Sequence, residues 1–233
     1  FICLQEAQIE DKINLLLASG KFPNWKAVHF HAKTQGHELA MLWNSERMQL
    51  TDQPRLILLP MLKGHSFIEY AFRMGGMAAT QRAAMTAQFL VDGKILRLTN
   101  LHTSFEGGYF HRRKQFKFLS QALRNEPVES EIICGDFNTP SYIPLMWRLQ
   151  QKTIQNIFGP EFINATPTLS WSFSLEIIDP TQTTAFLAKF PLWLRKLARS
   201  RMDYIFGRNL GNVRGELLDL SGSDHRPLLA NFK

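Results

Sequence analysis

The sequence predicts a sheet-rich α/β domain with two layers of sheet. Many short apolar runs have the length of a strand, whereas few stretches have helical spacing. The 233 residues are 45% hydrophobic, which is enough to bury a sizeable core. No internal repeat, low-complexity tract or Gly/Ser linker divides the chain. We therefore expect residues 1–233 to form a single domain.

The chain opens with the strand-like run FICLQE, residues 1–6. Because a buried strand with no preceding Met or cap is an unusual start for a domain, we expect an N-terminal piece to be missing from this sequence. Residues 10–20 follow, with Ile13, Leu16 and Leu17 at helical spacing and Gly20 as a C-terminal stop, and they predict a helix.

Residues 25–32, 37–44 and 54–60 each predict a strand, the last one bounded by prolines. Residues 86–104 give the clearest local signal, because two strand-like runs meet at Asp92-Gly93, a pair typical of a two-residue type I′ hairpin turn. On the second strand, side-chain alternation puts a set of apolar residues followed by polar ones on one face: Leu96, Leu98, Asn100 and His102.

Residues 109–126 predict a second helix, with Phe116, Leu119 and Leu123 facing inward. Its cations are expected to face mostly outward: Arg112, Arg113, Lys114, Lys117 and Arg124. The start of this helix can present Arg112 and Arg113 to substrate phosphates, and a solvated helix face explains the same run equally well. A buried strand at 132–134 and strands within 201–207 and 224–232 complete the order.

The charge balance favours a polyanionic partner. The net charge is +7 and the pI is about 9.6, which suits nucleic acid or an anionic lipid surface. The cysteines Cys3 and Cys134 lie in apolar runs and are expected to be buried free thiols. No apolar run reaches the roughly 18 residues of a membrane span, and the sequence gives no localisation.

Five stretches place polar side chains at the end of a strand-like run. Asp136 and Asn138 follow the strand at 132–134, and alternation would put them on one face. The other four stretches hold Glu6, then Asn100 with His102, then Asp203, and then Asp224 with His225. Any one of these residues alone would be a turn former or a surface group, but five such stretches in one chain indicate a site.

This set of residues suits metal-assisted chemistry on a phosphate ester. Carboxylates such as Glu6 and Asp224, with no cysteine nearby, form an oxygen site for Mg²⁺ or Mn²⁺. Two histidines can then serve the phosphate as base, acid or clamp, and Asp203 can orient one of them. Asp136 and Asn138 can hold an attacking water in line.

With these motifs, above all GDFN and SDHRP in this order, the sequence resembles the endonuclease/exonuclease/phosphatase superfamily over residues 2–232. That superfamily includes pancreatic-type deoxyribonucleases, apurinic endonucleases, neutral sphingomyelinases and inositol polyphosphate 5-phosphatases. The resemblance implies a four-layer α/β/β/α sandwich with the site where strand ends converge. It also implies that the family's first strand, which carries an Asn of the active site, is missing from this chain. It also implies a metal-dependent phosphoric ester hydrolase.

The resemblance also implies a role for each site residue. Glu6 resembles the main Mg²⁺ ligand, and Asp224 resembles a second acid of the metal site. His102, supported by Asn100, resembles the histidine at the scissile phosphate. Asp136 and Asn138 resemble the pair that orients the water and the phosphate; Asp203 resembles the acid that pairs with His225, the last histidine. Which histidine is acid and which is base stays open.

The substrate is left open by the sequence. We expect a phosphodiesterase, with nucleic acid favoured by the basic balance, and a monomer. Residues 185–201 predict a basic amphipathic helix after Pro191, which suits an anionic membrane and hence a lipid phosphodiester, although packing on the sandwich edge explains it as well. The 5-phosphatase signatures WxGDLNxR and PAWCDR are absent. A non-catalytic binding module of the same fold is the remaining alternative.

Overall fold

The computed structural model describes residues 1–6, 10–30, 38–62, 81–105, 107–140, 144–167, 171–174, 191, 193, 199–211, 213–220, 223 and 225–232. Within these ranges no helix has both the length and the apolar character needed to cross a membrane.

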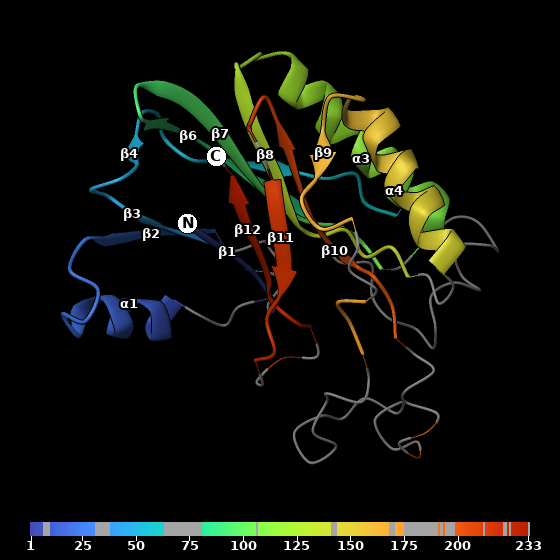
Figure 1. The fold of residues 1–233 in the computed structure, drawn as a ribbon, viewed down its shortest axis with the longest axis horizontal. Coiled ribbons are helices and arrows are strands. Elements are labelled where there is room, and N and C mark those ends of the chain that lie inside the picture. The colour runs from blue at the N-terminus through green and yellow to red at the C-terminus, as the bar shows by residue number, and fades with distance from the viewer. Residues whose placement is uncertain are drawn as a thin grey trace.

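A seven-stranded sheet lies at the centre of the molecule (Figure 1). Its strand order is β4 (Gln49–Leu50), β6 (Ala83–Val91), β7 (Lys94–His102), β8 (Ser130–Asp136), β10 (Asp203–Arg208) and β9 (Ile163–Asn164), and β5 (Arg55–Leu58) also pairs with β6. Only β7 and β8 run parallel; every other pair in this sheet is antiparallel. The parallel pair needs a crossover, which the chain makes through a helix.

A second, three-stranded sheet has the order β1 (Ile2–Gln5), β3 (Leu39–Asn44) and β2 (Trp25–Phe30). A separate antiparallel pair follows near the C-terminal end, β11 (Val213–Leu217) and β12 (Leu228–Phe232). The strands expected at 1–6, 25–32, 37–44 and 54–60 are therefore present, with slightly shorter bounds.

The elements form four layers. Met41 and Trp43 of β3 pack against Met85 and Phe89 of β6, so one core lies between the two sheets. The helices α3 (Gly108–Arg124) and α4 (Pro144–Phe158) cover the other face of the large sheet, with Phe116 and other apolar side chains in a second core. Helix α1 (Glu10–Ala18) covers the small sheet through Ile13 and Leu17. The predicted α/β/β/α sandwich is confirmed.

The turn between β6 and β7 is the predicted two-residue hairpin. Asp92 and Gly93 have φ of 48° and 78°, as a type I′ turn requires at both central positions. Strands β6 and β7 then pair along their whole length, from Val91 opposite Lys94 to Ala83 opposite His102. The Asp92-Gly93 turn thus sets the pairing register of β6 and β7, including the pair at the polar end of β7.

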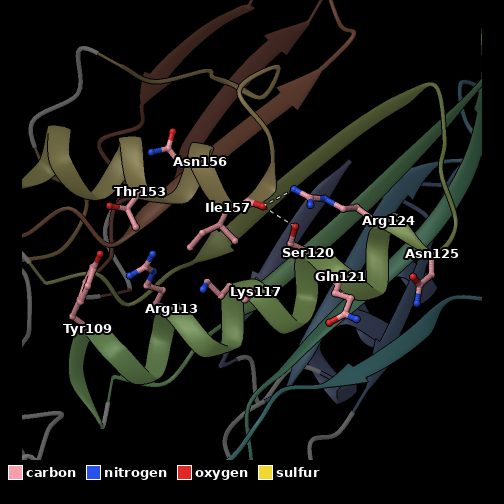
Figure 2. A pocket seen from close by; sticks show the side chains of 10 residues that line it. All are labelled: Tyr109, Arg113, Lys117, Ser120, Gln121, Arg124, Asn125, Thr153, Asn156 and Ile157. Atoms are coloured by element: carbon pink, nitrogen blue, oxygen red, sulfur yellow. Dashed lines mark hydrogen bonds between the residues drawn. The ribbon is translucent and has the colours of Figure 1, made fainter.

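Helices α3 and α4 lie side by side on the outer face of the large sheet (Figures 1 and 2). The Oγ of Ser120 and the guanidinium of Arg124 both donate to the carbonyl oxygen of Ile157, at 2.8 and 2.9 Å. These bonds use a carbonyl of the last turn of α4, which has no partner within its own helix.

Three features differ from the sequence predictions. Helix α4 and the strands β4, β9 and β11 were not predicted. Arg112 was expected on the outer face of α3, but it is buried and donates to the carbonyl oxygen of Phe105. The helix predicted over residues 185–201 lies mostly outside the described residues, and at its end Ser200 forms a β-bridge with Phe173 instead of helix.

Candidate functional site

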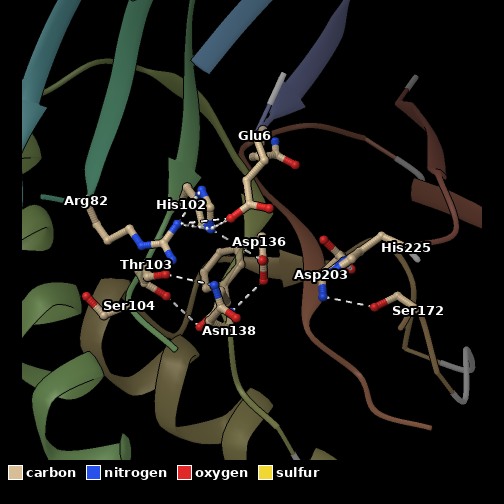
Figure 3. A network of polar contacts seen from close by, with 12 residues as sticks. Glu6, Arg82, His102, Thr103, Ser104, Asp136, Asn138, Ser172, Asp203 and His225 are labelled. Atoms are coloured by element: carbon tan, nitrogen blue, oxygen red, sulfur yellow. Dashed lines mark hydrogen bonds and ion pairs between the residues drawn. The ribbon is translucent and has the colours of Figure 1, made fainter. Parts of the chain in front are cut away.

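Three neighbouring strands bring their polar ends into one row. In the pairing register His102 of β7 lies opposite Asp136 of β8, and Asp136 lies opposite Asp203 of β10. Residues two and four positions back along these strands, such as Leu98 and Ile132, belong to the core between the sheets. The row therefore lies on the inner face of the large sheet, where that core ends (Figure 3).

Backbone hydrogen bonds extend this row one residue beyond the strands. The N–H of Thr103 donates to the carbonyl oxygen of Asp136 at 3.0 Å, and the N–H of Phe137 donates to that of Met202 at 2.9 Å. The hydroxyl of Thr103 also donates to the carbonyl oxygen of Phe137, at 2.6 Å. The segments next to the polar ends of β7, β8 and β10 are thus hydrogen-bonded to one another.

Asn138 lies next to Asp136, although not through strand alternation. Strand β8 ends at Asp136, and Asn138 has a left-handed backbone with φ of 46°. Its N–H donates to Oδ1 of Asp136 at 2.7 Å, and its side-chain Nδ2 donates to the carbonyl oxygen of Thr103 at 2.8 Å. A turn, rather than a pleated strand, therefore brings the predicted carboxylate and amide together.

His102 is surrounded by charged groups (Figure 3). Its Nε2 lies 3.6 Å from a carboxylate oxygen of Glu6 and 3.6 Å from one of Asp136. The Nη1 of Arg82 lies 2.7 Å from Nε2 and 3.2 Å from Nδ1 of His102, and 3.3 Å from the carboxylate of Glu6. The ring is thus fixed between two carboxylates and one permanent cation.

Arg82 is a site residue that the sequence analysis missed. It is buried, and it directly precedes β6, whose first residue, Ala83, pairs with His102. The Asp92-Gly93 turn fixes the hairpin register, so counting back from the turn places position 82 beside the end of β7. That count was the signal available in the sequence.

Asp203 and His225 form the predicted acid–imidazole pair. The Nδ1 of His225 lies 2.7 Å from Oδ2 of Asp203. The backbone of Asp203 is itself held, because the N–H groups of Met202 and Asp203 both donate to Oγ of Ser172, at 3.1 and 3.0 Å. Ser172 is a second supporting residue that the sequence analysis missed.

The segment carrying His225 is packed against residues 171–173. The N–H of Arg226 donates to the carbonyl oxygen of Ser172 at 2.7 Å, and its guanidinium lies 4.3 Å from the ring centre of Trp171. The ring of Phe173 contacts that of His225 edge-on, with centroids 5.1 Å apart. These contacts fix the position of the His225 ring.

The donor atoms available in this row suit a divalent cation. Asp136, Asp203 and His225 each offer one ligand atom, and these atoms lie within 4.8 Å of one another. The pKa of Asp136 is raised to about 7: burial raises it most, His225 lowers it, and the nearby Asp203 and Glu6 also raise it. Carboxylates crowded in this way are those that a cation stabilises, so the residues present fit Mg²⁺ or Mn²⁺.

The other predicted site residues lie in three different places. Asn100 is fully buried and hydrogen-bonds Gln5 and the backbone of the small sheet. Arg112 supports the segment after His102 through Phe105, and Arg113 lines a groove between α3 and α4 (Figure 2). Asp224 lies outside the described residues.

Comparison with known proteins shows which family this chain belongs to. Residues 1–225 match the family model described as the Endonuclease/Exonuclease/phosphatase family. A UPF0294 protein of Vibrio vulnificus (strain CMCP6) is 28% identical over 236 residues, and the match covers 99% of this chain. The chain spans only 66% of the length of that relative.

Solved structures with the same fold are more distant in sequence. A Bacteroides vulgatus endonuclease/exonuclease/phosphatase has a TM-score of 0.66 at 18% identity, covering 99% of this chain and 83% of that one. D. rerio TDP2, complexed with a single-strand DNA product, has a TM-score of 0.65 at 16% identity, with 99% and 84% covered. The human nocturnin catalytic domain with bound sulfate has a TM-score of 0.58 at 20% identity, with 99% and 80% covered.

Proposed function

Because the chain belongs to the endonuclease/exonuclease/phosphatase family, we propose that it is a divalent-metal-dependent hydrolase of phosphodiester bonds. The observation that carries this proposal is the row of His102, Asp136 and Asp203 on adjacent strand ends, with His225 paired to Asp203. An acid–imidazole pair, a second histidine and crowded carboxylates in one place are the parts that metal-assisted phosphate chemistry uses.

We assign the metal ion to Glu6 and Asp136, whose carboxylates both lie 3.6 Å from Nε2 of His102, with Asp224 as the second predicted ligand. Of the group formed by Asp136, Asp203 and His225, only Asp136 would then hold the metal, because Asp203 and His225 are hydrogen-bonded to each other and would serve proton transfer. A bound Mg²⁺ or Mn²⁺ supplies positive charge that stabilises the phosphate oxygens as negative charge grows in the transition state.

The residues of the chain perform the remaining steps. Asp136 and Asn138 hold a water molecule in line with the phosphorus atom. Asp203 accepts the hydrogen bond from Nδ1–H of His225, so Nε2 of His225 acts as the base that takes a proton from the water as its oxygen attacks. The bond between phosphorus and the leaving oxygen breaks, and that oxygen takes a proton from solvent water, while His102, held by Arg82, lies at the phosphate.

Nucleic acid is the substrate that we favour, because the net charge is +7 and the pI is about 9.6. A lipid phosphodiester is the second candidate, and a specific observation supports it. Phe105, in the segment after His102, is 39% exposed, and Tyr109 and Phe110 follow at 42% and 76%. Exposed apolar side chains beside the site suit an apolar part of a substrate.

Hydrolysis of bis-p-nitrophenyl phosphate in Mg²⁺, Mn²⁺ or EDTA tests the proposal. We expect turnover that requires the metal and falls at least about 100-fold in Asp136→Asn and in His225→Ala, because each removes a group from the reacting centre. Asp52→Asn changes an exposed acid distant from the site in the fold and is the matched control.

Full activity in both site variants, or turnover that EDTA leaves unchanged, would contradict the proposal. The rates of hydrolysis of plasmid DNA, RNA and sphingomyelin, measured in the same buffers, then rank the natural substrates. A folded protein that turns over none of these substrates would favour the non-catalytic binding module.

A further inference from the structure

The outer face of α3 and α4 is strongly basic. Helix α3 carries five Lys and Arg residues, α4 carries two, and neither contains Asp or Glu. Only Arg112 of these seven is buried. The outer helix on the opposite side of the molecule is different, because α1 contains Glu10 and Asp11 with a single cation, Lys12. Of the two outer helix layers, the one formed by α3 and α4 is therefore the basic one.

The same face exposes large apolar side chains. Six of them are more than two-fifths accessible: Tyr109 at 42%, Phe110 at 76%, Phe118 at 45%, Leu145 at 65%, Met146 at 45% and Leu149 at 56%. Single exposed apolar residues are ordinary on a protein surface, but six on two adjacent helices form a patch that requires an explanation.

Most of these apolar residues lie at the end of the helices next to the site. Tyr109 and Phe110 are in the first turn of α3, which follows the segment after His102, and Leu145 and Met146 are in the first turn of α4, which follows the segment after Asn138. The start of α3 lies beside the middle of α4, because Tyr109 lines one hollow together with Gln150 and Thr153.

A basic groove runs between the two helices behind this apolar end (Figure 2). Its volume is about 650 Å³, and its lining contains three cations and no acid. Arg113 and Lys117 direct their side chains from α3 into the groove, while Arg124 closes it near Ile157. An anionic phosphate group fits such a lining, whereas a cationic group would be repelled.

The combination of charges and apolar groups selects one occupant. A second copy of the chain, docked symmetrically, would place two basic faces against each other without acids. A nucleic acid would satisfy the cations but would leave Leu145, Met146 and Leu149 without apolar contacts. An anionic bilayer satisfies both, since its headgroups attract Lys and Arg and its interface accepts Leu, Met and aromatic rings.

We propose that the outer face of α3 and α4 docks on an anionic phospholipid surface. Aliphatic and aromatic side chains at the helix starts enter the interfacial region, and the cations of α3 and the groove contact lipid phosphates. This orientation brings the apolar residues beside His102 and Asp136 to the level of the headgroups. The proposal concerns binding alone and does not require the hydrolase activity.

Vesicle co-sedimentation tests the proposal with two kinds of variant. Lys114→Gln with Lys117→Gln removes two exposed cations, and Leu145→Gln with Leu149→Gln removes two exposed apolar groups. The matched control makes the same exchanges on α1, Lys12→Gln with Leu15→Gln, where Leu15 is 71% exposed. Vesicles contain phosphatidylcholine alone or with phosphatidylglycerol, and circular dichroism checks that each variant is folded.

We expect the wild type to bind vesicles that contain phosphatidylglycerol and to bind pure phosphatidylcholine much more weakly. The cation variant should lose about 30-fold in the partition coefficient, because each Lys near an anionic surface contributes about five-fold. The leucine variant should lose about 10-fold or more through lost apolar burial. The α1 variant should bind like the wild type.

Equal binding by the wild type and the leucine variant would overturn the proposal, as would a loss of binding in the α1 variant. Fluorescence anisotropy with a labelled single-stranded oligonucleotide measures whether the same face binds nucleic acid instead of a membrane. If the cation variant loses oligonucleotide binding while the wild type binds no vesicle, the face is a nucleic-acid surface and the membrane proposal is wrong.

Discussion

Gly135 illustrates how a single residue allows the site to form. Its φ is 132°, and a Cβ atom there would lie 2.1 Å from the carbonyl oxygen of Leu101 on the neighbouring strand β7. Only glycine permits this conformation and this close approach together. The result is that β7 and β8 stay paired up to His102 and Asp136, the first two members of the polar row.

Arg82 supports a prediction at the same scale. Arg82→Gln should lower kcat for bis-p-nitrophenyl phosphate by about 10- to 100-fold with little change in KM, because His102 and Glu6 lose the cation that fixes their geometry. Arg82→Lys, which keeps the charge, should restore part of the loss.

Arg47→Gln is the matched control, since Arg47 is exposed in the turn before β4. Steady-state kinetics and thermal unfolding would be measured on all three variants. A wild-type kcat in Arg82→Gln, with only a lower melting temperature, would make Arg82 a purely structural residue.

Single residues were also where the sequence was most informative about the site. Asp136, Asp203 and His225 were predictable because acids and imidazoles at the ends of apolar runs are rare and costly unless they have a task. Their pairing was only implied by resemblance, since His225 and Asp203 belong to different segments joined by tertiary packing. Ser172 was not predictable, because a serine in a loop has no distinguishing pattern.

At the scale of elements, Asn100 connects the two sheets. Its Nδ2 donates to the carbonyl oxygens of Leu4 on β1 and Ala40 on β3, at 2.9 and 3.0 Å, and its Oδ1 accepts from Gln5 at 2.6 Å. These bonds use a buried amide to fix the small sheet against β7. They also fix β1, the strand that leads into Glu6.

Asn100→Ala should therefore destabilise the fold. We expect a loss of about 3 kcal/mol in the free energy of unfolding, because several buried polar groups lose their partner at once. Urea unfolding followed by fluorescence measures the change, with the exposed Asn14→Ala on α1 as the control. A loss below about 1 kcal/mol would mean that water replaces the amide.

Helix α4 shows why one element escaped prediction. Its buried residues, such as Ile154 and Phe158, have helical spacing, but Leu145 and Leu149 are exposed on the opposite face and obscure the apolar stripe. Pro144 at its first position and Gly159 just beyond its end are the signals that remained. The β6–β7 hairpin, in contrast, was predicted correctly because Asp92-Gly93 fixes the turn locally.

At the scale of the whole molecule, the protonation of the buried carboxylate of Asp136 changes the free energy of unfolding. Burial raises the pKa of Asp136 from 3.8 to about 7, so between these values the folded protein holds a proton that the unfolded chain has released. The stability from this group is fully present below pH 3.8 and is lost as the pH rises through about 7. Above that value a cation bound at the site would offset the repulsion between Asp136 and the neighbouring carboxylates.

Thermal unfolding at about pH 5.5 and pH 8, in EDTA or in Mg²⁺, should therefore show two effects. In EDTA, raising the pH from about 5.5 to 8 should lower the melting temperature of the wild type more than that of Asp136→Asn. The variant has no carboxylate at this position to titrate. Mg²⁺ should raise the melting temperature of the wild type more at pH 8 than at pH 5.5. An equal Mg²⁺ response at both pH values, or a full response in Asp136→Asn, would rule out this coupling.

The candidate site combines side chains from segments spread along nearly the whole sequence. They run from Glu6 and Arg82 through Asp136 to Asp203 and His225. A protease that cuts the chain between Asp136 and Asp203 leaves two pieces, and each lacks side chains that the other holds. Neither piece has a complete site, because the sheet that aligns the row includes strands from both. A cut at this place therefore releases no fragment that carries the whole set of candidate site residues.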